Sequence, residues 1–232
     1  MKTFFKFFYF SLLFCCFHSV YSLDIDITDK NVQACYRGEY TRGSDLLNEI
    51  SITGLIELDY IITFKAGFSA GGTILDTNIN SYINISYAPF LRLPFIFSLS
   101  WIYSGLPEYE AHTHSLIPYM SYNARYAGIS LGFNFRFTSF FTEPSYFESI
   151  LSFYGYVNFI NNGSLRIGIG AGNFNEFHAR NLGAYFIDFF ASVKINKNFI
   201  FVNNIELMQS GGDGLTTTLL GIAFRTGVKF TW

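Results

Sequence analysis

Residues 112–115 read His-Thr-His-Ser and carry side chains that could support catalysis. A histidine can act as the general base that activates a serine nucleophile, which is the chemistry of ester and lipid hydrolysis. Two side chains of a β-strand share a face only at alternate positions. His112 and Ser115 are three positions apart, and His114 and Ser115 are neighbours, so each pair points to opposite faces of a strand. The spacing argues against a hydrolase, and we predict no catalytic residue and no enzyme activity.

The same segment contains a candidate metal site. His112 and His114 follow Glu108 and Glu110 in GLPEYEAHTH, and alternate positions of an extended segment can converge on one ion. Histidine and carboxylate ligands suit zinc. A single short cluster of this kind is more typical of a solvated loop. We therefore expect neither a metal nor another cofactor.

Two further features have simple structural interpretations. Cys35 is the only thiol beyond residue 22, and it cannot by itself form an internal disulfide or a cysteine metal site. Gly168, Gly170 and Gly172 in GIGAG occupy alternate positions, and no helical pattern follows them as a nucleotide-binding loop would require. We expect these glycines to be bare positions on one face of a strand that leave room for neighbouring side chains.

The chain begins with a pattern typical of a secretory signal peptide. Lys2 and Lys6 precede an uncharged run over residues 7–17, and Val20-Tyr21-Ser22 stand at the usual cleavage spacing. The apolar run is shorter than the ~20 residues that cross a bilayer as a helix. We therefore predict a cleaved signal over residues 1–22.

A lipid-modified cysteine at Cys15 or Cys16 is the alternative processing route. The bulky Phe14 before Cys15 disfavours it, because that processing prefers a small side chain, and no flexible polar tether follows. After the signal we predict a short N-terminal segment over residues 23–30 and a single domain over residues 31–232.

Composition excludes several classes of protein. Without residues 1–22, 13 of the 15 Lys and Arg side chains remain against 17 Asp and Glu, so no basic excess indicates nucleic-acid binding. After the signal, no stretch approaches 18 consecutive apolar residues, which excludes membrane-spanning helices. The unusual feature is the combination of 20% aromatic with 14% charged side chains.

Apolar and polar side chains alternate over most of the domain, and this is the pattern of β-strands with two different faces. The clearest case is GISLGFNFRFTSFF, where apolar side chains occupy every second position from Ile129 to Phe137. The predicted strands are about twelve and cover residues 31–40, 48–58, 60–73, 80–89, 94–104, 114–126, 128–140, 149–160, 164–174, 183–195, 198–209 and 216–232.

The connections between these strands alternate in length. Polar loops lie at residues 210–215, 175–182, 141–148 and 105–113. Short turns lie at residues 196–197, 161–163, near 127 and at 91–93. Long loops on one side and short turns on the other are the layout of a transmembrane barrel, with both chain ends on the short-turn side and an even strand number. Eight or ten strands are the alternatives, because no Gly, Pro or Asn marks a turn near residues 58–60.

Charged side chains fall on the polar face of the clearly alternating strands. A soluble sandwich or lipocalin-like barrel would point its apolar face inward, and periodicity alone does not distinguish the two. The signal peptide, the aromatic excess, the alternating connections and the last strand favour lipid, where an outward charge at mid-depth costs about 2–4 kcal/mol. Asn203 and Gln209 are exceptions that share a face with apolar neighbours. The predicted lumen-lining residues are Glu57, Lys65, Arg136, Arg166, Asp188, Lys194, Glu206, Arg225 and Lys229.

The last strand, LLGIAFRTGVKFTW, ends on an aromatic residue, and the alternate positions before it are apolar except for Thr226. Over residues 31–232 the chain resembles the bacterial outer-membrane β-barrel proteins. The resemblance implies an all-β, antiparallel up-and-down transmembrane barrel that contacts outer-membrane lipid and is inserted by the barrel-assembly machinery. The assembly signal that it implies consists of Leu220, Ile222, Phe224, Val228, Phe230 and Trp232. An aromatic ring such as that of Trp232 is favoured at the membrane interface, here the periplasmic one.

Two functions fit such a barrel. The first is a small porin-like channel for passive passage of small solutes, with mild anion preference set by the lumen arginines and lysines. The alternative is a structural or surface-interaction barrel, adhesin-like, in which paired charges close the lumen and the loops contact partners. A lipid-modifying enzyme ranks third, because of the spacing of His112, His114 and Ser115.

Overall fold

The computed structural model describes residues 27–42, 45–73, 76–89, 94–107, 110–140, 144–180, 184–211 and 217–232. The predicted signal peptide, the predicted turn at 91–93 and Glu108 lie outside these residues. No helix in the described ranges is long and apolar enough to cross a membrane.

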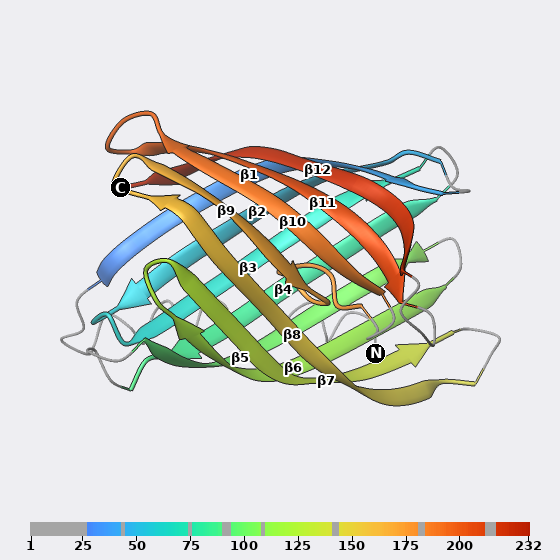
Figure 1. The fold of residues 1–232 in the computed structure, drawn as a ribbon. Helices are drawn as coiled ribbons and strands as arrows, with labels where there is room; N and C mark the ends of the chain where they lie inside the picture. Colours follow the sequence, from blue (N-terminus) through green and yellow to red (C-terminus); the bar gives the residue numbers. More distant parts are fainter. Residues whose placement is uncertain are drawn as a thin grey trace.

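Twelve antiparallel strands form one closed barrel, and each strand pairs with its neighbours in the sequence (Figure 1). The ring is closed by β12 against β1, with Arg37 opposite Arg225 in the register. The prediction of twelve strands is therefore confirmed, and the alternatives of eight or ten are wrong. The strands are β1 (Ile27–Thr41), β2 (Leu47–Leu58), β3 (Ile62–Gly72), β4 (Thr77–Tyr87), β5 (Phe95–Leu106), β6 (Ala111–Asn123), β7 (Ala127–Ser139), β8 (Tyr146–Asn161), β9 (Leu165–Gly172), β10 (Ala184–Lys194), β11 (Phe199–Gly211) and β12 (Thr217–Thr231).

A tight turn separates β2 from β3 where the sequence shows no ordinary turn residue. Asp59 and Tyr60 have positive φ angles of 49° and 57°. The N–H of Ile61 donates to the carbonyl of Leu58 at 3.0 Å, which closes a two-residue hairpin loop. Aspartate tolerates this conformation better than most residues do. The turn divides residues 47–72 into two strands, β2 and β3, and so keeps the number of strands even.

Both ends of the barrel domain lie at one end of the barrel, as predicted. The ends of β1 and β12 at Ile27 and Thr231 lie at the same end as the β2–β3, β4–β5, β6–β7, β8–β9 and β10–β11 connections, which we call the turn end. The opposite end is the loop end. Some predicted boundaries shift, because β1 begins at Ile27 instead of residue 31, and β6 and β8 extend into the predicted loops to begin at Ala111 and Tyr146.

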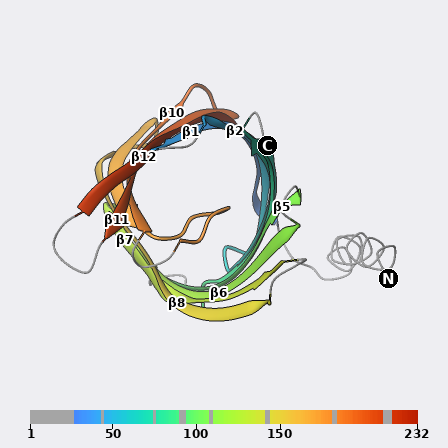
Figure 2. The ribbon, with the colours of Figure 1, turned by 90° about the vertical axis from the view of Figure 1, so that its right-hand side faces the viewer.

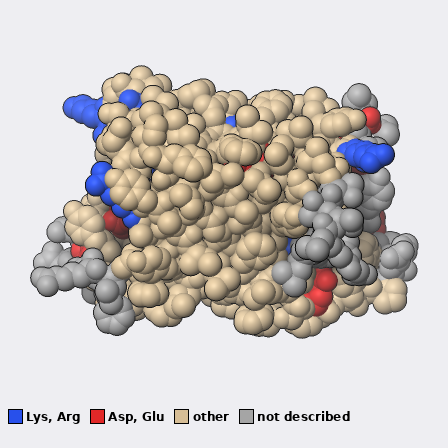
Figure 3. All heavy atoms as spheres, viewed as in Figure 1, with Lys and Arg blue, Asp and Glu red and all other residues tan. Residues whose placement is uncertain are grey.

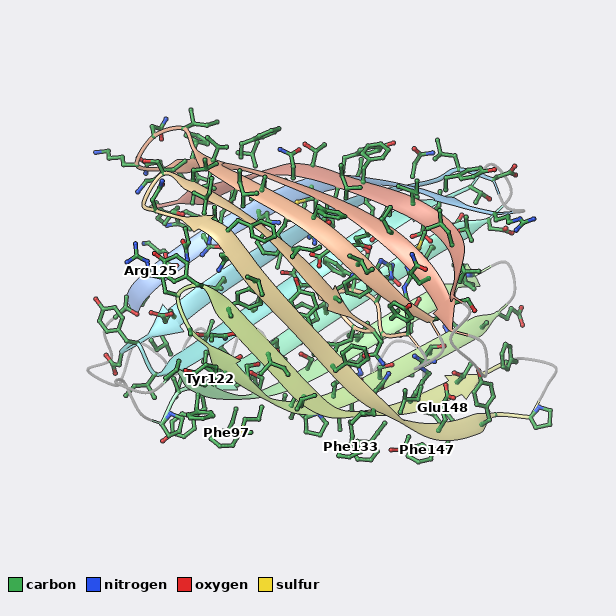
Figure 4. The ribbon with its side chains drawn as sticks, viewed as in Figure 1. Phe97, Tyr122, Arg125, Phe133, Phe147 and Glu148 are labelled. Atoms are coloured by element: carbon green, nitrogen blue, oxygen red, sulfur yellow. The ribbon has the colours of Figure 1, made fainter. Side chains whose placement is uncertain are left out.

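The outer face of the barrel is apolar. On β7 the exposed residues are Ile129, Leu131, Phe133, Phe135 and Phe137, whereas Asn134 between them is buried. Figure 4 shows Phe97, Phe133 and Phe147 projecting away from the barrel. In Figure 3 the Lys, Arg, Asp and Glu side chains gather toward the two ends, with a broad band of other residues between them. Such a belt suits contact with hydrocarbon.

The last strand presents most of its predicted apolar residues outward. Ile222, Phe224, Val228, Phe230 and Trp232 are between 37% and 53% exposed. Leu220 departs from the predicted alternation, because Met208 of β11 pairs with Gly221 and Gln209 pairs with Leu219, which leaves Leu220 as an unpaired bulge residue. Leu219 is therefore the exposed side chain at this level, at 47%.

A charge on the outer face should destabilise the fold far more than the same charge on the inner face. Phe133→Arg replaces a side chain that is 54% exposed near the middle of β7. We expect it to lower the free energy of unfolding in lipid vesicles by about 2–4 kcal/mol or more, because the guanidinium would lie in hydrocarbon. Reversible urea titration measures this loss.

The matched control is Ser130→Arg, which lies on the inner face of the same strand, where the Ser130 hydroxyl is 2.7 Å from that of Ser121. Its loss should be much smaller. Equal losses for the two variants would contradict the assignment of the faces.

Candidate functional site

The connection between β9 and β10 folds into the barrel, and Figure 2 shows it crossing the interior of the ring. We call residues 173–180 the inward hairpin. Phe174 and Ala179 form its only described β-bridge, and the Asn175 side-chain oxygen accepts the N–H groups of Phe177 and His178 at 3.1 and 2.9 Å. Residues 175–182 were predicted as a polar loop, and their described part lies inside the barrel.

Asn173 fixes the base of the inward hairpin to β8. Its side-chain oxygen accepts the N–H of Phe153 at 2.8 Å, and its amide donates to the carbonyl of Leu151 at 2.8 Å. The residue is fully buried, so all of these bonds are shielded from bulk solvent. These bonds to β8 direct the chain from the end of β9 into the lumen.

Two aromatic side chains of the hairpin pack on other strands of the barrel wall. Phe177 lies 6.0 Å from Tyr82 of β4 between ring centroids, and Phe174 lies 5.3 Å from Tyr119 of β6. Gly67 of β3 makes room, because a Cβ there would lie 2.9 Å from the Phe177 ring. Since β3 and β4 are half-way round the ring from β9 and β10, the hairpin spans the whole lumen.

Glu176 connects the hairpin to two strands through ion pairs. Its carboxylate pairs with Lys65 of β3 and, at 3.3 Å, with Arg225 of β12. Burial alone would raise the pKa of this carboxyl, but Lys65 and Arg225 together lower its pKa to about 2. Glu176 therefore stays ionised at neutral pH and holds both cations.

Arg37 of β1 is the centre of a second charged group. Its guanidinium lies 3.0 Å from Glu206 of β11, 2.6 Å from Glu39 and 3.9 Å from Glu49. It also donates to His178 of the hairpin at 3.0 Å, and His178 lies 3.6 Å from Glu49. This group ties the hairpin tip to β1, β2 and β11.

The base of the hairpin has two further polar contacts. Arg136 of β7 pairs with Glu148 of β8 at 2.9 Å and donates to the carbonyl of Ala179. Arg180 lies 3.9 Å from Glu39. Arg37, Glu39, Glu49, Glu176 and His178 were missed by sequence reasoning. The alternation of Cys35, Arg37 and Glu39 was the available signal for the first two.

Asp188 is the register partner of Glu206, which belongs to the Arg37 group, and the two are 3% and 4% exposed. Asp188 accepts hydrogen bonds from Tyr154 at 3.2 Å and from Asn204 at 3.0 Å. Within the described ranges, the remaining predicted lumen residues form no hydrogen bond or ion pair with the hairpin. Glu57 accepts the Thr28 hydroxyl at 2.9 Å. Arg166, Lys194 and Lys229 lie near the turn end of their strands.

The glycines of β9 give space to large inward side chains. A Cβ at Gly168 would lie 2.5 Å from the Phe190 ring, and one at Gly170 would lie 2.3 Å from a carboxylate oxygen of Asp188. This agrees with the expectation that these glycines leave room for neighbouring side chains.

The His-Thr-His-Ser segment has its side chains on opposite faces, as the spacing predicts. His114 stacks on Trp101 at 5.9 Å, and its ring is 5.2 Å from that of Tyr103. Ser115 is 3% exposed and lies opposite Arg136 in the register, on the inner face. Within the described ranges, no group of three or more His, Cys, Asp or Glu side chains could hold a metal ion.

Polar atoms without a protein partner are concentrated in the lumen. Within the described part of the chain, buried side-chain nitrogen or oxygen atoms lack a hydrogen bond to protein in Arg37, Glu49, Thr53, Asn78, Asn80, Asn134, Ser152 and Asn204. All of these residues share the inner face with the charges above, by the strand register. Each of these atoms is also closed to solvent, so they mark positions where the inner face is polar and tightly packed.

No protein-family model matches the chain, and no curated protein matches it by sequence. Three solved structures share its architecture. The NanC porin superposes with a TM-score of 0.58 at 12% identity, over 85% of this chain and 98% of that chain. The KdgM porin gives 0.55 at 10% identity, over 86% and 99% of the two chains. The translocator domain of the autotransporter NalP from Neisseria meningitidis gives 0.52 at 12% identity, over 91% of each chain. The closed sheet and these likenesses together show that the chain has the fold of the outer-membrane β-barrel proteins.

Proposed function

We propose that this protein is a porin-like channel of the outer membrane, through which small solutes pass along a hydrated lumen narrowed by the inward hairpin. The observation that carries the proposal is the polar and charged inner face of the closed twelve-stranded barrel. The NanC and KdgM porins, whose fold this chain shares, support it. Barrels of more than about eight strands enclose more space than their side chains fill, and water in that space would provide a path for solutes.

The hairpin would set the size limit of the channel. It reaches from β9 to the opposite wall and is held there by Phe177 on one side and Glu176 on the other. A segment fixed in this way would leave only narrow passages beside it and would exclude large molecules. Small solutes are therefore the proposed cargo.

A closed barrel is the second candidate function, and the ion pairs favour it. Glu176 and His178 are bound to four strands, β1, β2, β3 and β12. If no water path remains beside these pairs, the barrel would be structural or would act through its loop end. We propose no enzymatic role, because Ser115 is separated from His112 and His114 by the sheet.

Removing the hairpin should widen the channel. We expect the wild-type protein to form small conducting pores in planar bilayers, and replacement of residues 174–179 by a short Gly-Ser linker to raise single-channel conductance several-fold. The physical reason is that the linker carries neither the aromatic side chains nor the carboxylate that cross the lumen. Glu176→Gln should give a smaller rise in conductance, or flicker, because it removes both ion pairs while keeping the backbone.

Glu57→Gln is the matched control, because Glu57 lies in the lumen and bonds to Thr28 but not to the hairpin. It should leave conductance unchanged. If neither the wild type nor the linker variant conducts, the channel proposal fails and the closed barrel stands.

We also propose that the end of β12 is the signal read by the barrel-assembly machinery. Trp232 stacks on Phe230 at 5.4 Å, and the Lys30 ammonium lies 5.6 Å from its ring centroid. Trp232→Asp should sharply reduce the amount of folded protein in the outer membrane, because a carboxylate replaces an interfacial ring. Channels that do assemble should conduct normally, since the side chain is outside the lumen. Unchanged surface levels would contradict the assignment, and Trp232→Phe is the conservative control.

A further inference from the structure

The lysines and arginines of the lumen fall into two groups that differ in their partners. At the level of the hairpin, Arg37, Lys65, Arg136, Arg180 and Arg225 each have a carboxylate within 4.0 Å. Among the described residues, Arg166, Lys194 and Lys229 have no carboxylate at such a distance. All three lie toward the turn end, on β9, β10 and β12.

The three unpaired cations share one wall. Lys194 and Lys229 are both register partners of Ile200, on either side of β11. Arg166 is the register partner of Ser192, which lies two positions before Lys194 on the same face. Within β9 to β12 no acidic residue interrupts this stretch of the wall. The carboxylates at this end are Asp29 on β1 and Glu57 on β2, which accept bonds from Asn31 and Thr28, and Asp29 also attracts Lys229.

Arg166 is held in a fixed orientation. Its guanidinium carbon lies 5.1 Å from the ring centroid of Tyr156 and 4.9 Å from that of Phe190. Its Nε donates to the Asn158 side-chain oxygen at 2.8 Å. Gly168 lies on β9, between the strands that carry Tyr156 and Phe190, and it has no Cβ to displace the Phe190 ring. The two terminal nitrogens of the guanidinium therefore form a preorganised fork with no described protein acceptor.

We propose that this wall, with Arg166 at its β9 edge and Lys194 and Lys229 further along it, is a binding site for the oxyanion group of a small solute, a carboxylate or a phosphate. The inference rests on the proposed channel function and names its substrate class. A guanidinium fork matches both oxyanions through two parallel hydrogen bonds. The lysines add positive potential in a narrow lumen, where low-dielectric walls strengthen it. Anions entering from the turn end, or leaving through it, would pause at this wall.

The test measures binding separately from transport. The full-length protein, folded in detergent micelles, is titrated calorimetrically with inorganic phosphate, with succinate and with uncharged sucrose. We expect saturable binding of at least one of the two anions and none of sucrose. Arg166→Gln should weaken anion binding at least about tenfold, since hydrogen bonds to charged groups are worth more than that factor. Arg166→Lys should restore little of it, because an ammonium lacks the fork.

Arg125→Gln is the matched control, because Arg125 is an exposed cation of the same end that packs over Tyr126 and is not part of the wall. It should leave anion binding unchanged. Heat-modifiable migration in gels checks that each variant folds.

The same variants in planar bilayers separate the two proposals. Anion-over-cation selectivity that falls several-fold in Arg166→Gln, at similar conductance, supports the site. Conductance without anion binding or selectivity overturns the site and leaves the channel. Anion binding without conductance overturns the channel and leaves the site. Equal anion binding by wild type and Arg166→Gln overturns the site whatever the conductance, and preference for phosphate or succinate identifies the oxyanion.

Discussion

Closure of the sheet through β12 and β1 is the constraint on which the rest of this molecule depends. An open sheet would leave the backbone groups of two edge strands unpaired, which hydrocarbon does not tolerate. Closure requires each strand to have one face outside and one inside, so the choice of residue at alternate positions fixes both surfaces at once. The outer surface becomes a belt of Phe, Ile and Leu, and the inner surface collects serine, asparagine and the charges. The polar residues of each strand line the lumen because hydrocarbon requires the other face to be apolar.

A polar lumen needs partners for its charges, and the inward hairpin provides many of them. Glu176 pairs with both Lys65 and Arg225, and His178 completes the group around Arg37. Leaving one member of such a buried pair without its partner costs several kcal/mol. The hairpin is therefore part of the electrostatic balance of the barrel as well as an obstruction within it. The turn-end wall around Arg166 lacks this compensation, and that contrast distinguishes a structural set of charges from a set free to meet solutes.

The strands, their faces and the strand number could be predicted from the sequence, because period-two alternation is a local signal. Most strand boundaries needed no distant information, and even Asp59 and Tyr60 were bracketed by the patterns on either side. The path of residues 173–180 could not be predicted. Whether a polar connection turns inward depends on partners such as Lys65, Tyr82 and Arg225, which are far away in the sequence. The bulge at Leu220 could not be predicted for the same reason, since it arises from the register with β11. Arg37 was missed because Ala34 and Gly38 weaken the apolar face of its strand.

The central claim is that water fills the lumen on both sides of the hairpin, and cysteine accessibility tests it most directly. In a background without native cysteines, single replacements at Ser98 and Ser104 probe the inner face of β5 toward the turn end and the loop end. Phe97→Cys probes the outer face, where the native side chain is 49% exposed. With the protein in lipid vesicles, a small charged thiol reagent should modify Ser98→Cys and Ser104→Cys and spare Phe97→Cys. Inner cysteines that stay unmodified, or an outer cysteine that reacts as fast as they do, would contradict the account.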